Sequence, residues 1–128
     1  MSRLAVAALS CAALAVAGCG SGERVFEAGE FVDEANAAGA GIELGERLVS
    51  TREGIEVHGF ELTTGGGGSL TVTPDSAAAT EEYERCDGSA ALRCYRVANV
   101  VLGFEEEDLP RPDALTGVDA AVRALASD

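Results

Sequence analysis

The most apolar part of the chain after residue 18 is Leu92-Arg93-Cys94-Tyr95-Arg96-Val97-Ala98-Asn99-Val100-Val101-Leu102-Gly103-Phe104. Its valines and leucines predict one of two structures: an inner strand with two covered faces, or a tight hairpin that turns near Val97-Ala98. A single bulged strand is the preferred interpretation, and the hairpin is the alternative.

The preceding sequence predicts an antiparallel hairpin from strands over residues 42–49 and 55–63. Both segments contain alternating apolar and polar residues, and Thr51-Arg52-Glu53-Gly54 between them is typical of a turn. In the second strand the apolar alternation slips by one residue at His58-Gly59, which predicts a β-bulge there.

A glycine run follows the hairpin. Gly65-Gly66-Gly67-Gly68-Ser69 lacks the lysine that would follow in a phosphate-binding loop, so it is predicted to be a flexible loop between strands. Residues 69–73 then predict a short strand with Leu70 and Val72 facing inward.

Three helices are predicted from apolar periodicity and capping residues. The first covers residues 28–38 and ends at Gly39, with Gly41 as the second choice of cap. The second begins at Thr73-Pro74-Asp75-Ser76 and runs to about Cys86. The third follows Pro110 and Pro112, and its apolar positions are Leu115, Val118, Val122 and Leu125.

These elements predict an α+β fold: one small two-layer domain over residues 26–128. We expect a mainly antiparallel sheet of about four strands with about three helices packed against it. Since the chain has 128 residues, it is long enough for one domain with a modest core.

The charge balance is strongly acidic and narrows the choice of partners. The chain has 22 aspartates and glutamates against 9 basic residues, all of them arginine, for a net charge of −13 at pH 7. Nucleic-acid binding is not expected, because lysine and arginine supply most of its affinity by neutralising phosphates. The same charge would repel the domain from an anionic lipid surface.

The N-terminal segment has the features of an export signal. Arg3 precedes an apolar run from Leu4 to Val16 that would make only about 20 Å of helix, too short to span a bilayer comfortably. Small residues then lead to Cys19, in the sequence Leu14-Ala15-Val16-Ala17-Gly18-Cys19. The segment is therefore interpreted as a secretory signal peptide.

This segment resembles the lipobox of bacterial lipoproteins. The resemblance implies that the thiol of Cys19 carries a diacylglycerol thioether and that cleavage occurs after Gly18. Residues 19–25 would then be a lipidated cysteine and a flexible tether, holding the domain on the extracytoplasmic side of the cell membrane. The body resembles small lipoproteins of GC-rich Gram-positive bacteria, a likeness that implies no particular activity.

Outside the cytoplasmic membrane, Cys86 and Cys94 are predicted to form a structural disulfide. A metal site would need two more ligands, and His58 is the only histidine. A redox pair more usually has two intervening residues, and here there are seven. The bridge would contribute about 2.5 kcal/mol on the loop-entropy model.

No motif in the sequence predicts catalysis, a cofactor or a metal. Glu105-Glu106-Glu107-Asp108 lacks the ligand spacing and central glycine of a calcium loop. The expected function is a non-catalytic binding or accessory module of the cell envelope, with an envelope protein as a possible partner. The alternative is a small carboxylate-dependent hydrolase, which would require His58 and residues 105–108 to converge within about 10 Å of one another.

Overall fold

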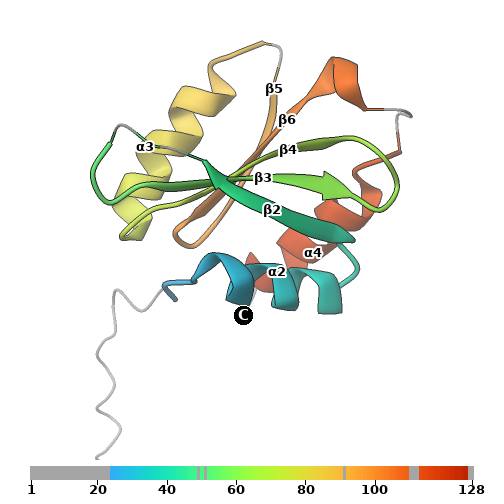
Figure 1. The fold of residues 1–128 in the computed structure, drawn as a ribbon, viewed down its shortest axis with the longest axis horizontal. Coiled ribbons are helices and arrows are strands. Elements are labelled where there is room, and N and C mark those ends of the chain that lie inside the picture. Colours follow the sequence, from blue (N-terminus) through green and yellow to red (C-terminus); the bar gives the residue numbers. More distant parts are fainter. Residues whose placement is uncertain (1–23, 49, 51, 91, 110–112, 127–128) are drawn as a thin grey trace, which may run out of the picture.

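The computed structural model of the chain describes residues 24–48, 50, 52–90, 92–109 and 113–126, which form a five-stranded sheet with helices on both faces (Figure 1). The predicted signal peptide, its cleavage site and Cys19 lie outside these residues. The elements in chain order are α2 (Ala28–Ala37), β2 (Ile42–Leu48), β3 (Glu56–Leu62), β4 (Gly67–Val72), α3 (Ser76–Asp87), β5 (Leu92–Val97), β6 (Val100–Glu105), the 3-10 turn η1 (Glu106–Asp108) and α4 (Thr116–Ala126).

The sheet is antiparallel throughout, with strand order β2-β3-β4-β6-β5. Because β6 pairs antiparallel with both β4 and β5, those two strands run in the same direction, and α3 is the crossover between them. The α+β class and the β2–β3 hairpin are confirmed. The sheet has one strand more than the four expected.

The additional strand arises because Leu92–Phe104 is a hairpin, so the preferred single strand is wrong. Val97 pairs with Val100, and the chain reverses through Ala98 and Asn99. Ala98 has φ of 53°, in the left-handed region. Residues other than Gly and Asn seldom adopt this conformation, so the sequence did not predict a turn at Ala98.

The bulge predicted at His58-Gly59 in β3 is wrong, and the first hairpin has its irregularity in β2 instead. β3 pairs with β4 without interruption from Glu56 to Glu61. The irregularity is in β2, where Leu44 pairs with Phe60 but Arg47 pairs with His58. The apolar alternation slips in β3 because Val57 lies on one face and Phe60 on the other, and both faces are partly covered.

The helices cover opposite faces of the sheet. Successive strand residues point to opposite faces. Phe104 is buried with Phe31 of α2 and Val118 of α4 in the main core. A Cβ on its neighbour Gly103 would lie 3.2 Å from Sγ of Cys86 in α3. α3 is therefore on one face, and α2 and α4 are on the other (Figure 1).

The predicted two-layer arrangement is accordingly wrong, and the domain has three layers. The physical reason is that β6 is apolar on both faces: Leu102 is buried toward α2 and α4, and Val101 is buried on the side of α3. Ala79 of α3 is also fully buried and completes this second, smaller apolar contact area.

Helix α3 begins two residues later than predicted. Its N-cap is Asp75, whose carboxylate accepts a hydrogen bond from the backbone N of Ala78 at 2.8 Å. Thr73, predicted to be part of the helix start, is buried. The single proton of its hydroxyl is shared between the carbonyl oxygens of Asp75 and Asn99, which lie 2.8 and 2.9 Å from Oγ1. Thr73 therefore fixes the β4–α3 connection against the β5–β6 turn.

The glycine run is only partly a loop. Gly65 and Gly66 have positive φ and form the β3–β4 turn. Gly67 and Gly68 belong to β4, contrary to the prediction of a loop, whereas Ser69 belongs to this strand as predicted. The carbonyl oxygen of Gly103 leaves no space for a Cβ at Gly68, so this position in the sheet requires glycine.

Candidate functional site

A groove lies on the α3 side of the sheet, where α3 packs over β5 and β6 and leaves β3 and β4 partly open. Its volume is about 810 Å³, and a shallower hollow of about 440 Å³ extends it toward β2. Strand residues that line the groove include Glu61, Gly67, Ser69, Thr71, Gly103 and Glu105. Glu82, Arg85 and Cys86 form its wall on α3.

The floor of the groove is a row of small residues at one level of the sheet. Gly59 on β3 pairs with Ser69 on β4, and Ser69 pairs with Gly103 on β6. A Cβ on Gly59 would meet no atom within 4 Å, so the floor is open there. Glycine within a strand is often found where a ligand or another chain approaches the backbone closely.

Three carboxylates lie in the next row of the same face. Glu43 of β2 pairs with Glu61 of β3, and Glu61 pairs with Gly67 of β4. Since Gly68 pairs with Phe104, Gly67 is level with Glu105 of β6. Like charges directly opposite each other on neighbouring strands are destabilising, by roughly 0.2–1 kcal/mol. We call Glu43, Glu61 and Glu105 the carboxylate row.

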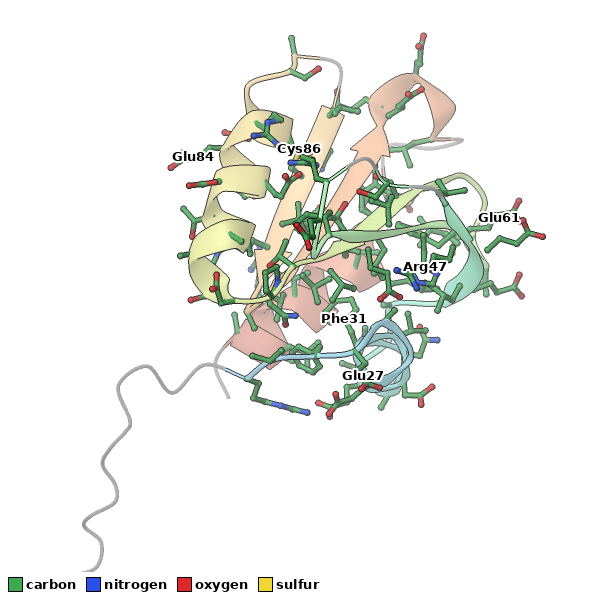
Figure 2. The ribbon with its side chains drawn as sticks, turned by 60° about the vertical axis from the view of Figure 1, so that its left-hand side comes forward. Glu27, Phe31, Arg47, Glu61, Glu84 and Cys86 are labelled. Carbon is green, nitrogen blue, oxygen red and sulfur yellow. A yellow bond between two sulfur atoms is a disulfide. The ribbon has the colours of Figure 1, made fainter. Side chains whose placement is uncertain are left out.

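The disulfide forms part of the α3 wall. Cys86 and Cys94 are joined, with their Cα atoms 6.2 Å apart, which connects the last turn of α3 to β5. The predicted pair is therefore at disulfide distance. Figure 2 shows Cys86 on the side of α3 nearer the sheet, whereas Glu84 points away from it.

An ion-pair network holds α3 to the β2–β3 turn. The carboxylate of Glu82, whose side chain is only 12% exposed, pairs with Arg52 from the turn and with Arg85 of the same helix, the latter at 2.7 Å. The hydrogen bond from Arg52 lowers the pKa of Glu82, and the same bond raises the pKa of Arg52. This network fixes one end of the groove wall.

Because the pKa of Glu82 is lower in the folded protein, its ion pairs stabilise the fold at neutral pH. This stabilisation is lost as pH falls through the folded-state pKa. Glu82→Gln should therefore cost about 1 kcal/mol of unfolding free energy at neutral pH and less in acid. Urea denaturation across this pH range measures both effects. The control is Glu81→Gln, an exposed residue of the same helix; an equal loss there would contradict a specific role for the network.

His58 is on the opposite face from the groove. It alternates with Phe60 and Leu62, which point into the main core. Its Nε2 is 2.6 Å from Oε2 of Glu56, and its Nδ1 is 3.3 Å from the carbonyl oxygen of Gly45. These contacts account for both ring nitrogens.

The acidic run that follows β6 does not converge with His58. The pairing registers place His58 level with Leu102 of β6, two strands away, and Glu105 is three residues further along β6. The Cα atoms of His58 and Glu105 are therefore about 14 Å apart, and their side chains are on opposite faces of the sheet. Glu106 pairs with Arg93 at 3.0 Å, and Glu107 is exposed. The structure therefore does not assemble the site that the hydrolase alternative requires.

The part of the chain that the structure describes contains no group of three His, Cys, Asp or Glu side chains placed to hold a metal ion. Within the same residues, no helix is long and apolar enough to cross a bilayer. No family model matches the chain, and no curated protein and no solved structure is significantly similar to it.

Proposed function

We propose that this chain is a non-catalytic binding module of the cell envelope, anchored to the membrane by a lipid on Cys19, with its ligand site in the groove. The observation that carries the proposal is the groove itself. Its volume of about 810 Å³ is within the range of roughly 300–1,000 Å³ typical of ligand sites. Its floor at Gly59 and Ser69 allows an occupant to approach the sheet closely.

The chemistry of the lining supports binding over catalysis. Cys86 is oxidised, so its sulfur is not available as a thiolate nucleophile. Glu82 is held by two arginines, and His58 is on the other face of the sheet. A hydrolase would need a nucleophile or water in contact with a positioned base, and the described groove residues show no such hydrogen-bonded pair.

The start of the domain supports an orientation in which the groove faces away from the membrane. Arg24 pairs with Glu30 and Glu34 of α2 at 2.9 and 2.6 Å, and its guanidinium is 4.3 Å from the centre of the Phe26 ring. Residues 20–23 span at most about 14 Å. The anchor would therefore join the protein on the α2 side of the sheet, and the groove is on the α3 side.

The test uses a photoreactive side chain in place of Gly59, in the full chain produced in its own cells. Its Cβ would meet no atom within 4 Å, so the substitution should be tolerated. We expect a discrete crosslinked product in membranes. The matched control is Gly29 on α2, where a Cβ is equally unobstructed. The same product from both positions would contradict a ligand site in the groove.

The anchor is tested in the same cells by Cys19→Ala. A diacylated chain stays on the membrane because each buried methylene contributes about 0.8 kcal/mol. We expect the variant to lose the lipid mass and to leave the membrane fraction. If it remains there with its signal segment attached, the lipoprotein proposal is wrong, whatever the crosslinking shows.

A further inference from the structure

The carboxylate row has no basic partner within the described part of the protein. Glu43, Glu61 and Glu105 are exposed, and none of them takes part in an ion pair among these residues. Three arginines around the groove pair with other carboxylates: Arg52 and Arg85 pair with Glu82, and Arg93 pairs with Glu106. The groove thus presents unneutralised negative charge beside an open floor.

From this arrangement we propose that the groove binds an extended segment of a basic polypeptide. Arginine or lysine side chains at alternate positions of that segment would lie on Glu43, Glu61 and Glu105. The proposal rests on the proposed function and names the ligand class of the same site. A cation placed on this row would relieve the repulsion between Glu43 and Glu61, which face each other across β2 and β3.

The total length of the row matches an extended chain that crosses the strands. Neighbouring strands are about 4.8 Å apart, so Glu43 to Glu105 covers three spacings, or about 14 Å. An extended peptide rises about 3.4 Å per residue and directs alternate side chains to one side. Three cations at positions i, i+2 and i+4 therefore also span about 14 Å. The middle cation lies about 2 Å from the level of Glu61, a difference that a flexible arginine or lysine side chain can bridge.

The small-residue row next to the carboxylates suits the backbone of such a segment. Gly59 leaves open space above β3. The hydroxyl of Ser69 has no hydrogen-bond partner among the described residues, so it is free to bond a peptide group of the occupant. The α3 wall, with Arg85 already paired to Glu82, limits the groove on its other side.

Charge also decides between the possible occupants. A second copy of this chain carries a net charge of −13 and would be repelled from the carboxylate row. Anionic ligands such as phosphates are disfavoured for the same reason. A basic polypeptide is attracted by both the row and the overall field of the protein, which also increases its rate of association.

The test is fluorescence anisotropy with the full chain in a neutral detergent and two labelled peptides of equal composition. In one peptide arginine alternates with serine; in the other the arginines are contiguous. We expect the alternating peptide to bind about 5-fold more tightly, and the affinity to fall as salt is added. Equal affinity for the two peptides would overturn the proposed arrangement.

The second arm compares two double variants that remove the same charge. Glu43→Gln with Glu61→Gln should weaken binding of the alternating peptide about 5- to 10-fold. Glu81→Gln with Glu84→Gln should weaken it less than about 2-fold, because both residues are exposed on α3 and Glu84 points away from the sheet (Figure 2). Equal losses would show attraction to net charge alone and would overturn the proposal.

Two further outcomes separate this inference from the proposed function. Self-association of the full chain that the Glu43 and Glu61 substitutions abolish would show that a second copy occupies the groove, and would overturn the basic-peptide assignment. A discrete crosslink from position 59, together with no binding of either peptide, would support a ligand site while overturning its basic-peptide chemistry.

Discussion

Replacing Asn99 with alanine is expected to lower the free energy of unfolding by about 3 kcal/mol or more. Asn99 is fully buried in the β5–β6 turn. Its side-chain oxygen accepts a hydrogen bond from the backbone N of Phe26 at 2.7 Å. Its amide nitrogen donates to the carbonyl oxygens of Phe26 and Thr73 at 3.1 and 2.8 Å. Alanine would leave these three backbone groups buried without partners.

The size of the effect follows from where these groups lie. Phe26 lies just before α2, and Thr73 connects β4 to α3, so Asn99 joins three parts of the chain that are distant in sequence. Each buried polar group left unsatisfied costs roughly 1–3 kcal/mol, against a total stability of about 5–15 kcal/mol for a domain of this size. Urea denaturation of the full chain measures the loss.

Asn36→Ala is the matched control. Asn36 also makes a pair of side-chain bonds to the backbone, both to Ile42, at 2.9 and 2.7 Å. Its surroundings are only partly buried, so water can replace the lost bonds and the cost should be about 1 kcal/mol. If the two substitutions cost the same, the burial of Asn99 is not what makes it important. Asn99→Asp, which keeps the acceptor and removes the donor, should also destabilise the fold.

The helices and the first hairpin were predictable because their signals are local. The Gly54 turn has φ of 81°, and Gly39, after the last residues of α2, has φ of 102°, both as expected from glycine at those positions. At the start of α4 the predicted apolar positions Leu115 and Val118 are buried, as the periodicity indicates, and Ala79 is the buried residue of α3. In these segments the secondary-structure propensity of the residues and the pattern of apolar positions predict the same structure.

The sheet was harder to predict because it is covered on both faces. Alternation identifies a strand and its inner face only when one side is exposed to water. In β6 both Val101 and Leu102 are buried, so its sequence does not alternate between apolar and polar residues. The turn of the β5–β6 hairpin includes Ala98 with a positive φ, and alanine is not a residue that predicts a turn. In β3, Val57 and Phe60 are on different faces, which gave the false bulge.

The groove could be anticipated only in part. Pairing residues 42–49 with 55–63 already places Glu43 near Glu61, so a like-charge pair could have been noticed in the sequence. The position of Glu105 could not, because it depends on β6 lying beside β4. The reason for a glycine at position 103 could not be predicted either, because it depends on the Sγ of Cys86 lying over this residue. Long-range pairing, which is weakly encoded in short segments, decides both positions.

The double variant Cys86→Ser with Cys94→Ser is expected to lose about 2.5 kcal/mol of unfolding free energy, which lowers Tm by about 10 °C or more. The disulfide closes a short loop from the end of α3 to β5, so its loss increases the entropy of the unfolded chain and frees the α3 wall of the groove. Thermal unfolding followed by circular dichroism measures the change.

A thiol reductant should lower the Tm of the unsubstituted protein by the same amount and leave the double variant unchanged. If the reductant has no effect on the unsubstituted protein even when both thiols are shown to be free, the bridge contributes nothing to stability. In that case the packing of α3 on β5 and β6, including that of Ala79, and the Arg52–Glu82 pair hold the helix in place.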